Sequence, residues 1–328
     1  AGSAGFCTTQ PHRELSTAER ADKWADFAEP KFSPTVVEGL RDQLPDLKSV
    51  ATRFDDENCE LTDKELDICR RALAKAKACG IDEIPAELFK EKGELQAALY
   101  ALVRRIWRGE EVPEEMVRGL FVMVYKGKGS SDDMSKYRCI CLLTHAYKLL
   151  SAVLLRRLAR ECEAWLPQSQ AGFRRFRGCV DNIFILAELI DDVIGRDGEA
   201  YIVFIDFVAA FDSVSHKLLD EALAAAGASD KSRAIFRAIY DKATAAVRVR
   251  EGQEEAVSRA FGIGRGLVQG DICSPYGYII ALAFLFYKHD PEAVAGGGFV
   301  GGPAVAAGGA AEVGVAAEPA AEPAAEPE

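Results

Sequence analysis

The sequence predicts a helix-rich α/β (α+β) fold that ends in a low-complexity segment. Short runs of β-favouring apolar residues at 120–126 and 200–206, and the period-two alternation "AAVRVRE" at 245–251, predict strands. Longer segments between them have apolar residues three and four positions apart, which predicts helices. From residue 291 the composition changes to Gly and Ala and then to Glu-Pro-Ala-Ala repeats. Such a composition cannot form a packed core, so we expect residues 291–328 to be disordered.

The first half of the chain is expected to be mostly helical. Residues 1–60 are acidic and weakly patterned, which predicts a partly ordered leader. Thr62 and Glu65 have the spacing of a capping box, and the helix that they begin is expected to end near Gly80. Residues 85–108 predict a second helical stretch. The strand at 120–126 follows, and then the polar loop "KGKGSSDD".

The second half alternates helices and strands. Helices are expected at 145–165, 181–194, 213–226 and 230–242, and an apolar, buried helix at 275–287. The strand at 200–206 ends in a carboxylate, Asp206. We therefore expect three parts: the leader at 1–60, one folded domain at 61–290, and the tail at 291–328.

Composition argues against a membrane-spanning protein and against a cysteine-based zinc site. The longest apolar run, 276–287, has 12 residues, well short of the ~20 needed to span a bilayer, so no membrane association is expected. The nine cysteines form no Cys-x-x-Cys pair, which indicates reduced thiols in an intracellular protein rather than a zinc site. Nuclear location is one option, and nothing in the sequence determines the oligomeric state.

Charge is unevenly distributed. The chain has a formal charge of −11, yet residues 104–178 contain fifteen Lys or Arg and eight Asp or Glu, a net charge of +7. A basic region in an acidic protein is a candidate phosphate-binding surface. The alternative is a set of solvated helix faces.

Asp206 is the first candidate site residue. A carboxylate at the end of a rigid strand is a common position for a ligand of Mg²⁺, which prefers hard oxygen ligands. The alternative is a turn or helix-capping aspartate. The strand alone does not separate the two.

Five segments in order resemble reverse transcriptases of non-LTR (LINE-type) retrotransposons. They are "KACGIDEIPAELF" (77–89), "VYKGKGSSDDMSKYRCICLL" (124–143), "QSQAGFRRFRGCVDNI" (168–183), "FIDFVAAFDSV" (204–214) and "GLVQGDICSP" (266–275). The resemblance covers about 210 residues. It implies the fingers and an incomplete palm of a right-hand polymerase, with an RNA template, a DNA primer and a deoxynucleoside triphosphate as partners.

The resemblance also implies roles for individual residues. Asp206 and the backbone carbonyl of Phe207 would bind two Mg²⁺ ions, which stabilise the attacking and leaving oxygens of nucleotidyl transfer. The residues implied at the incoming nucleotide are Phe211, Gln269, Gly270, Arg138 and Arg174, and those implied on the nucleic acid are Arg177, Lys126 and Lys128. Phe211 could equally be a core residue, and Arg174 and Arg177 could be surface ion pairs. His216 matches a family position, but a helix-start histidine explains it equally well.

The chain departs from the family pattern after residue 275. The family supplies two further carboxylates in a "Y/F-A-D-D" hairpin, but no Asp follows Asp290 here. In addition, Cys139, Cys141 and Ala209 replace the family's Pro, Ser and Lys. We therefore expect a reverse transcriptase lineage that is truncated and has little or no polymerase activity in this chain. The alternatives are a non-catalytic RNA-binding remnant and a conceptual translation without a stable product.

Overall fold

The computed structural model describes residues 11, 14–33, 60–207, 209–251 and 253–289. These residues contain one mixed sheet in the order β2-β1-β3-β4, with β5 paired to β3. The strands are β1 (Arg118–Tyr125), β2 (Tyr137–Leu142), β3 (Thr244–Glu251), β4 (Glu254–Val257) and β5 (Phe261–Gly262). β1 and β3 are parallel, and the other pairs are antiparallel. The predicted strands at 120–126 and 245–251 are confirmed.

Helices account for most of the remaining described residues. They are α1 (Thr17–Phe32), α3 (Asp63–Ala72), α4 (Ala86–Lys90), α5 (Glu94–Trp107), α6 (Glu114–Val117), α7 (His145–Cys162), α8 (Cys179–Gly195), α9 (Ala210–Ser213), α10 (His216–Ala225), α11 (Asp230–Asp241) and α12 (Ser274–His289). The mixed helix-and-sheet class is confirmed. No helix among the described residues is long and apolar enough to cross a membrane. The predicted disordered tail at 291–328 lies outside the described residues.

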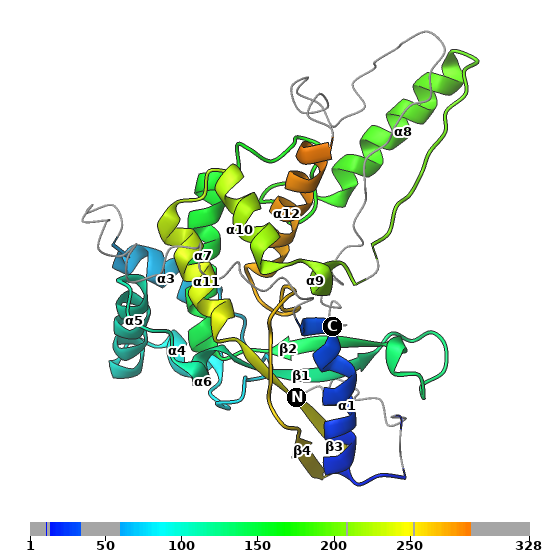
Figure 1. Cartoon of the computed structure of the whole chain (residues 1–328). Coiled ribbons are helices and arrows are strands. Elements are labelled where there is room, and N and C mark those ends of the chain that lie inside the picture. The colour runs from blue at the N-terminus through cyan, green and yellow to red at the C-terminus, as the bar shows by residue number, and fades with distance from the viewer. Residues whose placement is uncertain (1–10, 12–13, 34–59, 208, 252, 290–328) are drawn as a thin grey trace, which may run out of the picture.

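The core forms around α7. Thr144 caps this helix by accepting a hydrogen bond from the Tyr147 amide at 3.1 Å. Leu149, Leu150, Leu154 and Leu158 are at most 1% exposed, since they repeat at the helical spacing on a face covered by neighbouring elements. Helices α3, α5, α6 and α11 contact α7, and α10 contacts both α11 and α12 (Figure 1).

Helix α1 was not predicted, although Ser16 and Glu19 form a complete capping box at its start. It contacts β3, β4 and β5. Trp24 and Phe32 are each 1% exposed, and the Phe32 ring lies 5.1 Å from that of Phe121 on β1. The leader therefore contributes a helix to the core of the sheet.

Two helix predictions were wrong in extent. The helix that begins after Thr62 ends at Ala72 instead of near Gly80, because Leu73 leaves the helical conformation (ψ 126°) and is buried at 4% exposure. The predicted stretch at 85–108 is two helices, α4 and α5. Gly93 precedes α5 in an extended conformation, and glycine is a poor residue for continuing a helix.

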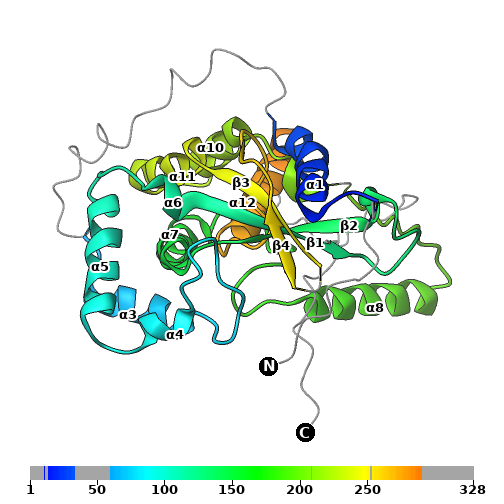
Figure 2. The ribbon, with the colours of Figure 1, turned by 90° about the horizontal axis from the view of Figure 1, so that it is seen from below.

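The predicted strand at 200–206 was also wrong. Residues 199–207 have no regular secondary structure, and most of them are exposed. Phe204 is 73% exposed and Tyr201 is 65% exposed. This segment returns from α8, which projects from the body of the molecule in Figure 1 and lies at its edge in Figure 2. A strand requires a hydrogen-bonding neighbour, and no described segment provides one here.

Candidate functional site

The loop at 262–275 is held by backbone hydrogen bonds from several elements. The amide of Gly264 donates to the carbonyl of Phe32 at 2.8 Å, and the amide of Leu267 donates to the carbonyl of Phe211 at 2.8 Å. His216 Nε2 lies 2.9 Å from the carbonyl oxygen of Gly266. This contact gives His216 a structural partner at the start of α10, which agrees with its interpretation as a helix-start histidine.

Gln269 and Gly270 lie against the edge of β2. The amide of Cys141 donates to the carbonyl of Gln269 at 2.7 Å. Gly270 has φ +119°, and a Cβ at this position would overlap the carbonyl oxygen of Cys141. The glycine is therefore required for close approach to β2. The side chain of Gln269 is exposed, so it is free to contact a ligand.

A buried carboxylate connects this loop to α7 through hydrogen bonds. Asp271 is 5% exposed and accepts hydrogen bonds from Ser151 on α7 and, at 3.0 Å, from Ser274. Ser151 Oγ also accepts a bond from the Cys273 amide at 3.1 Å. Burial raises the pKa of Asp271, and these hydrogen bonds partly offset the rise. The sequence did not single out this residue, because one aspartate in a glycine-rich loop gives no signal of burial.

Asp206 lies in the exposed segment 199–207. Burial, and then the nearby carboxylate of Asp206, raise the pKa of Tyr278. Tyr278 also stacks on Phe211 with ring centroids 4.9 Å apart, and Phe173 meets Phe211 edge-on at 6.2 Å. Phe211 is thus half-buried between two aromatic rings, which matches its role as a core residue. Its contact with a nucleotide stays a prediction.

The hairpin between β1 and β2 carries a basic pocket. Its cavity of about 390 Å³ is lined by Lys126, Lys128, Lys136 and Arg138 together with Gly129 and Ser135. Lys126, Lys128 and Arg138 are exposed. The structure therefore brings together three of the predicted contact residues. Convergent cations around an open pocket are suited to phosphate.

The two other predicted arginines lie outside this pocket. Arg174 is 7% exposed, pairs with Glu163 at 2.9 Å, and donates to the carbonyls of Pro167 and Gln170. These are the contacts of a structural arginine, and they occupy most of its donors. Arg177 is exposed and donates to the carbonyl of Gln168 at 2.6 Å. Their roles at nucleotide and nucleic acid stay predictions.

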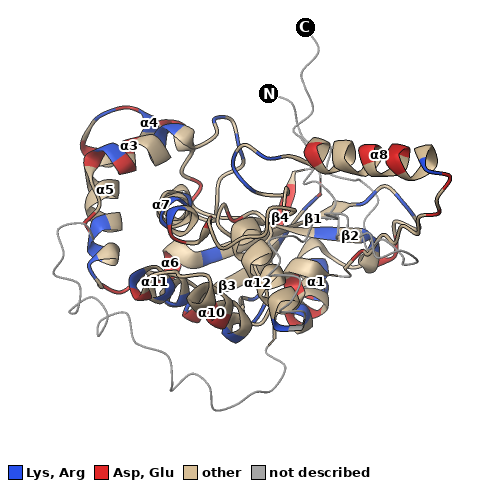
Figure 3. Cartoon of the chain, turned by 90° about the horizontal axis from the view of Figure 1, so that it is seen from above, with Lys and Arg blue, Asp and Glu red and all other residues tan. Residues whose placement is uncertain are grey.

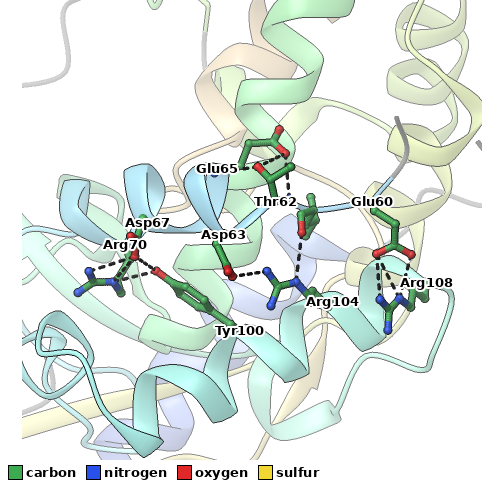
Figure 4. A network of polar contacts seen from close by, with 10 residues as sticks. Glu60, Thr62, Asp63, Glu65, Asp67, Arg70, Tyr100, Arg104 and Arg108 are labelled. Carbon is green, nitrogen blue, oxygen red and sulfur yellow. Dashed lines mark hydrogen bonds and ion pairs between the residues drawn. The ribbon is translucent and has the colours of Figure 1, made fainter. Parts of the chain in front are cut away.

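Most of the other basic charge in residues 104–178 is balanced by carboxylates. At least six of the eleven cations outside the pocket have an acidic partner, namely Arg104, Arg105, Arg108, Arg157, Arg160 and Arg174. Figure 4 shows two of these contacts, between Arg104 and Asp63 and between Arg108 and Glu60. The helical part of the basic region therefore ties α3 to α5 and α7. The exposed, converging cations are those of the hairpin.

A comparison with protein families identifies the lineage. A family model described as reverse transcriptase (RNA-dependent DNA polymerase) matches residues 126–293, about half of the chain. The chain belongs to the reverse transcriptase family. The match begins at the basic hairpin and includes Asp206, the loop at 262–275 and α12.

Curated relatives show the branch of this family. The chain is 27% identical over 234 residues to a 115 kDa protein of the type-1 retrotransposable element R1DM of Drosophila melanogaster, which is 69% of this chain and 21% of that protein. It is 28% identical over 148 residues to a Pol polyprotein from element R2 of Popillia japonica, which is 45% of this chain and 20% of that protein. It is 24% identical over 260 residues to a 149 kDa protein of transposon TX1 of Xenopus laevis, which is 78% of this chain and 19% of that protein. This is a reverse transcriptase domain of the non-LTR, LINE type, and the chain spans about a fifth of the length of these relatives.

Asp206 belongs to no cluster of three or more potential metal ligands among the residues that the structure describes. Within the described ranges, no group of three or more His, Cys, Asp or Glu side chains is arranged to hold a metal ion. Asp206 is an exposed single carboxylate, and two Mg²⁺ ions at the separation of a two-metal site need more negative charge than one aspartate supplies. The expected two-ion site therefore requires carboxylates in addition to Asp206.

The sequence analysis did not single out a second carboxylate of the segment that carries Asp206. Asp212, at the end of the "FIDFVAAFDSV" segment, is half-buried. Burial raises its pKa, and the cations of Lys31, Arg265 and Lys126 partly offset the rise. Lys126 therefore lines the hairpin pocket and also acts electrostatically on Asp212. The position of Lys31 on the unpredicted helix α1 explains why the sequence gave no signal for this cluster.

Proposed function

We propose that this chain supplies the template- and nucleotide-contacting part of an RNA-directed DNA polymerase. Residues 61–290 would be the fingers and part of the palm, with the β1–β2 hairpin as the phosphate-contacting surface. The observation that carries the proposal is the convergence of Lys126, Lys128 and Arg138 around one open pocket. β2, which carries Arg138, also holds Gln269 and Gly270 at its edge.

The proposed partners are an RNA template paired with a DNA primer and a deoxynucleoside triphosphate. Exposed Lys and Arg bind phosphate without reading sequence, so affinity should fall with salt and depend little on sequence. In this arrangement the exposed Gln269 and the half-buried Phe211 lie outside the hairpin pocket. They would contact the base and sugar, while the hairpin contacts phosphate.

Binding of an RNA–DNA hybrid tests the proposal. The triple variant Lys126→Ala, Lys128→Ala, Arg138→Ala removes three exposed cations. We expect the slope of log K against log salt to become shallower by about 2–3, since each lost phosphate contact contributes roughly 0.9. Fluorescence anisotropy of a labelled hybrid at several salt concentrations measures this slope.

A matched control removes the same number of cations from a different part of the chain. The triple variant Arg104→Ala, Arg105→Ala, Arg108→Ala also removes three cations, but each has a carboxylate partner. We expect this control to change the salt slope by less than one contact. Equal losses in the two triple variants would refute the hairpin as the binding surface.

A second candidate function is nucleic-acid binding without catalysis, favoured by the absence, among the described residues, of a group of three or more potential metal ligands that includes Asp206. We propose that residues 1–328 alone bind the hybrid and give no primer extension with Mg²⁺. Extension that Asp206→Ala abolishes would show that a complete metal site forms in this chain and would exclude the second candidate.

A further inference from the structure

Helix α8 and the turn that precedes it form an exposed apolar arm. None of the seventeen residues of α8 is buried. The large apolar side chains of this arm that are more than 60% exposed are Phe176 (90%), Val180 (75%), Ile183 (65%), Phe184 (63%) and Ile194 (68%). An isolated helix of this length is only marginally stable in water, so its apolar surface calls for a packing partner.

The apolar residues of α8 follow a heptad pattern. Val180, Ile183, Ala187, Ile190 and Ile194 are spaced by three, four, three and four residues. This is the spacing of the a and d positions of a coiled coil, where two helices interlock side chains along a seam. All of these residues are exposed except Ile190, which is half-buried. The helix thus presents a seam to solvent in the described structure.

The net charge of the arm is positive just before α8 and negative in the C-terminal half of the helix. Arg175 and Arg177 are exposed just before α8, and Asp181 lies in its first turn. Glu188, Asp191 and Asp192 lie in the C-terminal half, ahead of Arg196 (Figure 3). Negative charge near a helix C-terminus opposes the helix dipole, so these acids do not stabilise their own helix. Asp192 pairs with Arg196 at 2.7 Å, and Asp191 has no ion-pair partner among the residues that the structure places.

We propose that α8 is a self-association helix that pairs antiparallel with α8 of a second copy of this chain. A two-fold axis near Phe184 and Ile185 makes the interface self-complementary. Ile183 then packs against Ala187 of the second copy, and Val180 against Ile190 of the second copy. Parallel pairing would place the acidic halves side by side, which like charges disfavour.

The antiparallel alignment also matches the charges. In the same register Arg177 comes level with Asp191 of the second copy, at positions that flank the apolar seam. Such flanking pairs set the orientation of helices in coiled coils. The two-fold axis creates this pair twice. Charge complementarity therefore selects a second copy, in one orientation, as the occupant of the apolar seam.

The oligomeric state of the full 328-residue chain tests the proposal. The seam is less than three heptads long, so we expect a reversible dimer with a dissociation constant on the order of micromolar. Sedimentation velocity from about 1 to 200 μM, after nuclease treatment and under reducing conditions, should show a monomer–dimer equilibrium. A monomer throughout this range would overturn the proposal. So would a monomer whose α8 amides are protected from hydrogen exchange, since the face would then be covered by another part of the same chain.

Two substitutions distinguish this interface from nonspecific hydrophobic association. Ile183→Asp places a charge in the seam and should weaken the dimer at least about tenfold. Ile185→Asp changes the same residue type on the same helix outside the seam, and should weaken it less than about threefold. Equal effects of the two substitutions would contradict the seam.

Charge reversal tests the orientation. Arg177→Asp and Asp191→Arg should each weaken the dimer, by roughly three- to tenfold, because each places like charges opposite one another. The double variant restores both pairs and should recover most of the affinity. Far-UV circular dichroism confirms that each variant is folded. A double variant no better than the single variants would overturn the antiparallel register.

Discussion

The loop at 262–275 and the segment at 199–207 both carry motifs of the reverse transcriptase family. The loop is fixed by hydrogen bonds to several elements, whereas the segment is irregular and exposed. The loop is tied to α1, α7, α9 and α10 and to β2, and its Leu267 is fully buried. The segment with Asp206 has no regular structure, and its Phe204 is 73% exposed. The difference teaches that a strand-forming sequence becomes a strand only when a neighbour accepts its backbone hydrogen bonds.

A third segment supports this explanation. β3, at residues 244–251, also has β-favouring residues, and it lies between β1 and β4 in the sheet. Its Val247 and Val249 are at most 2% exposed. Apolar β-branched residues thus occur in both segments, and what separates them is the presence of paired strands on either side.

The largest expected effect is on the tightly held loop. Gly270→Ala forces a side chain into the carbonyl of Cys141 at φ +119°, a conformation that is strained for any residue with a Cβ. We expect the free energy of unfolding to fall by about 3 kcal/mol or more, as measured by urea denaturation. Gly195→Ala at the end of α8 is the control, because a Cβ there meets nothing within 4 Å. A loss below about 1 kcal/mol for Gly270→Ala would mean that the loop is not held as described.

A medium effect should appear as a change in pH dependence. Burial raises the pKa of Asp271 above its ordinary value of 3.8, so the folded state holds a proton that the unfolded state releases. This contribution to stability is fully present below pH 3.8 and is lost as pH rises through the folded-state pKa. Relative to Asp271→Asn, the wild-type protein should therefore lose stability as pH rises above about 4, by up to roughly 1.4 kcal/mol per pH unit.

Asp67 provides the control of opposite sign for this measurement. Its hydrogen bond with Tyr100 and the neighbouring Arg70 lower the pKa of Asp67 (Figure 4). Relative to Asp67→Asn, the wild-type protein should therefore lose stability as pH falls below the ordinary pKa. Parallel pH curves for wild type and Asp271→Asn would show that Asp271 is not buried as a proton-binding group.

The smallest effect is expected in the open segment. Phe204→Ser removes a large apolar side chain that is 73% exposed, so unfolding free energy should change by less than about 0.5 kcal/mol. Phe261→Ser is the matched change in the sheet, where Phe261 is 4% exposed and lies 5.9 Å from Phe121. This second change should cost about 3 kcal/mol or more. A comparable loss for Phe204→Ser would show that the open segment is packed in solution.

The sequence patterns predicted elements well wherever the signal is local. The helices at 145–162 and 230–241 have periodic apolar residues and side-chain caps at Thr144 and Ser229. The strand at 118–125 has a continuous run of β-favouring apolar residues. The missed helix α1 also had a local signal, the Ser16 and Glu19 capping box. Its role could not be predicted, because packing of Phe32 against Phe121 joins residues far apart in the chain.

The candidate site was predictable to a similar degree. Lys126, Lys128 and Arg138 were named from motifs, and their convergence follows from the hairpin that joins β1 and β2. Asp212 and Asp271 were not predicted as site or anchoring residues, because their environments come from Lys31 on α1 and Ser151 on α7. Whether Arg174 forms an ion pair or contacts a ligand was left open by the motif, and its partner Glu163 lies on a turn that only the fold brings near.

The sequence by itself determined the family of this protein, most of its helices and the cations of its hairpin, because those features depend on local order and spacing. Only the tertiary structure decided that Gly270 must approach β2, that Asp271 is buried, and that the chain around Asp206 is an open segment instead of a strand. The physical reason is that burial and strand pairing depend on which distant segments come together, and a local pattern holds no information about the neighbour that completes it.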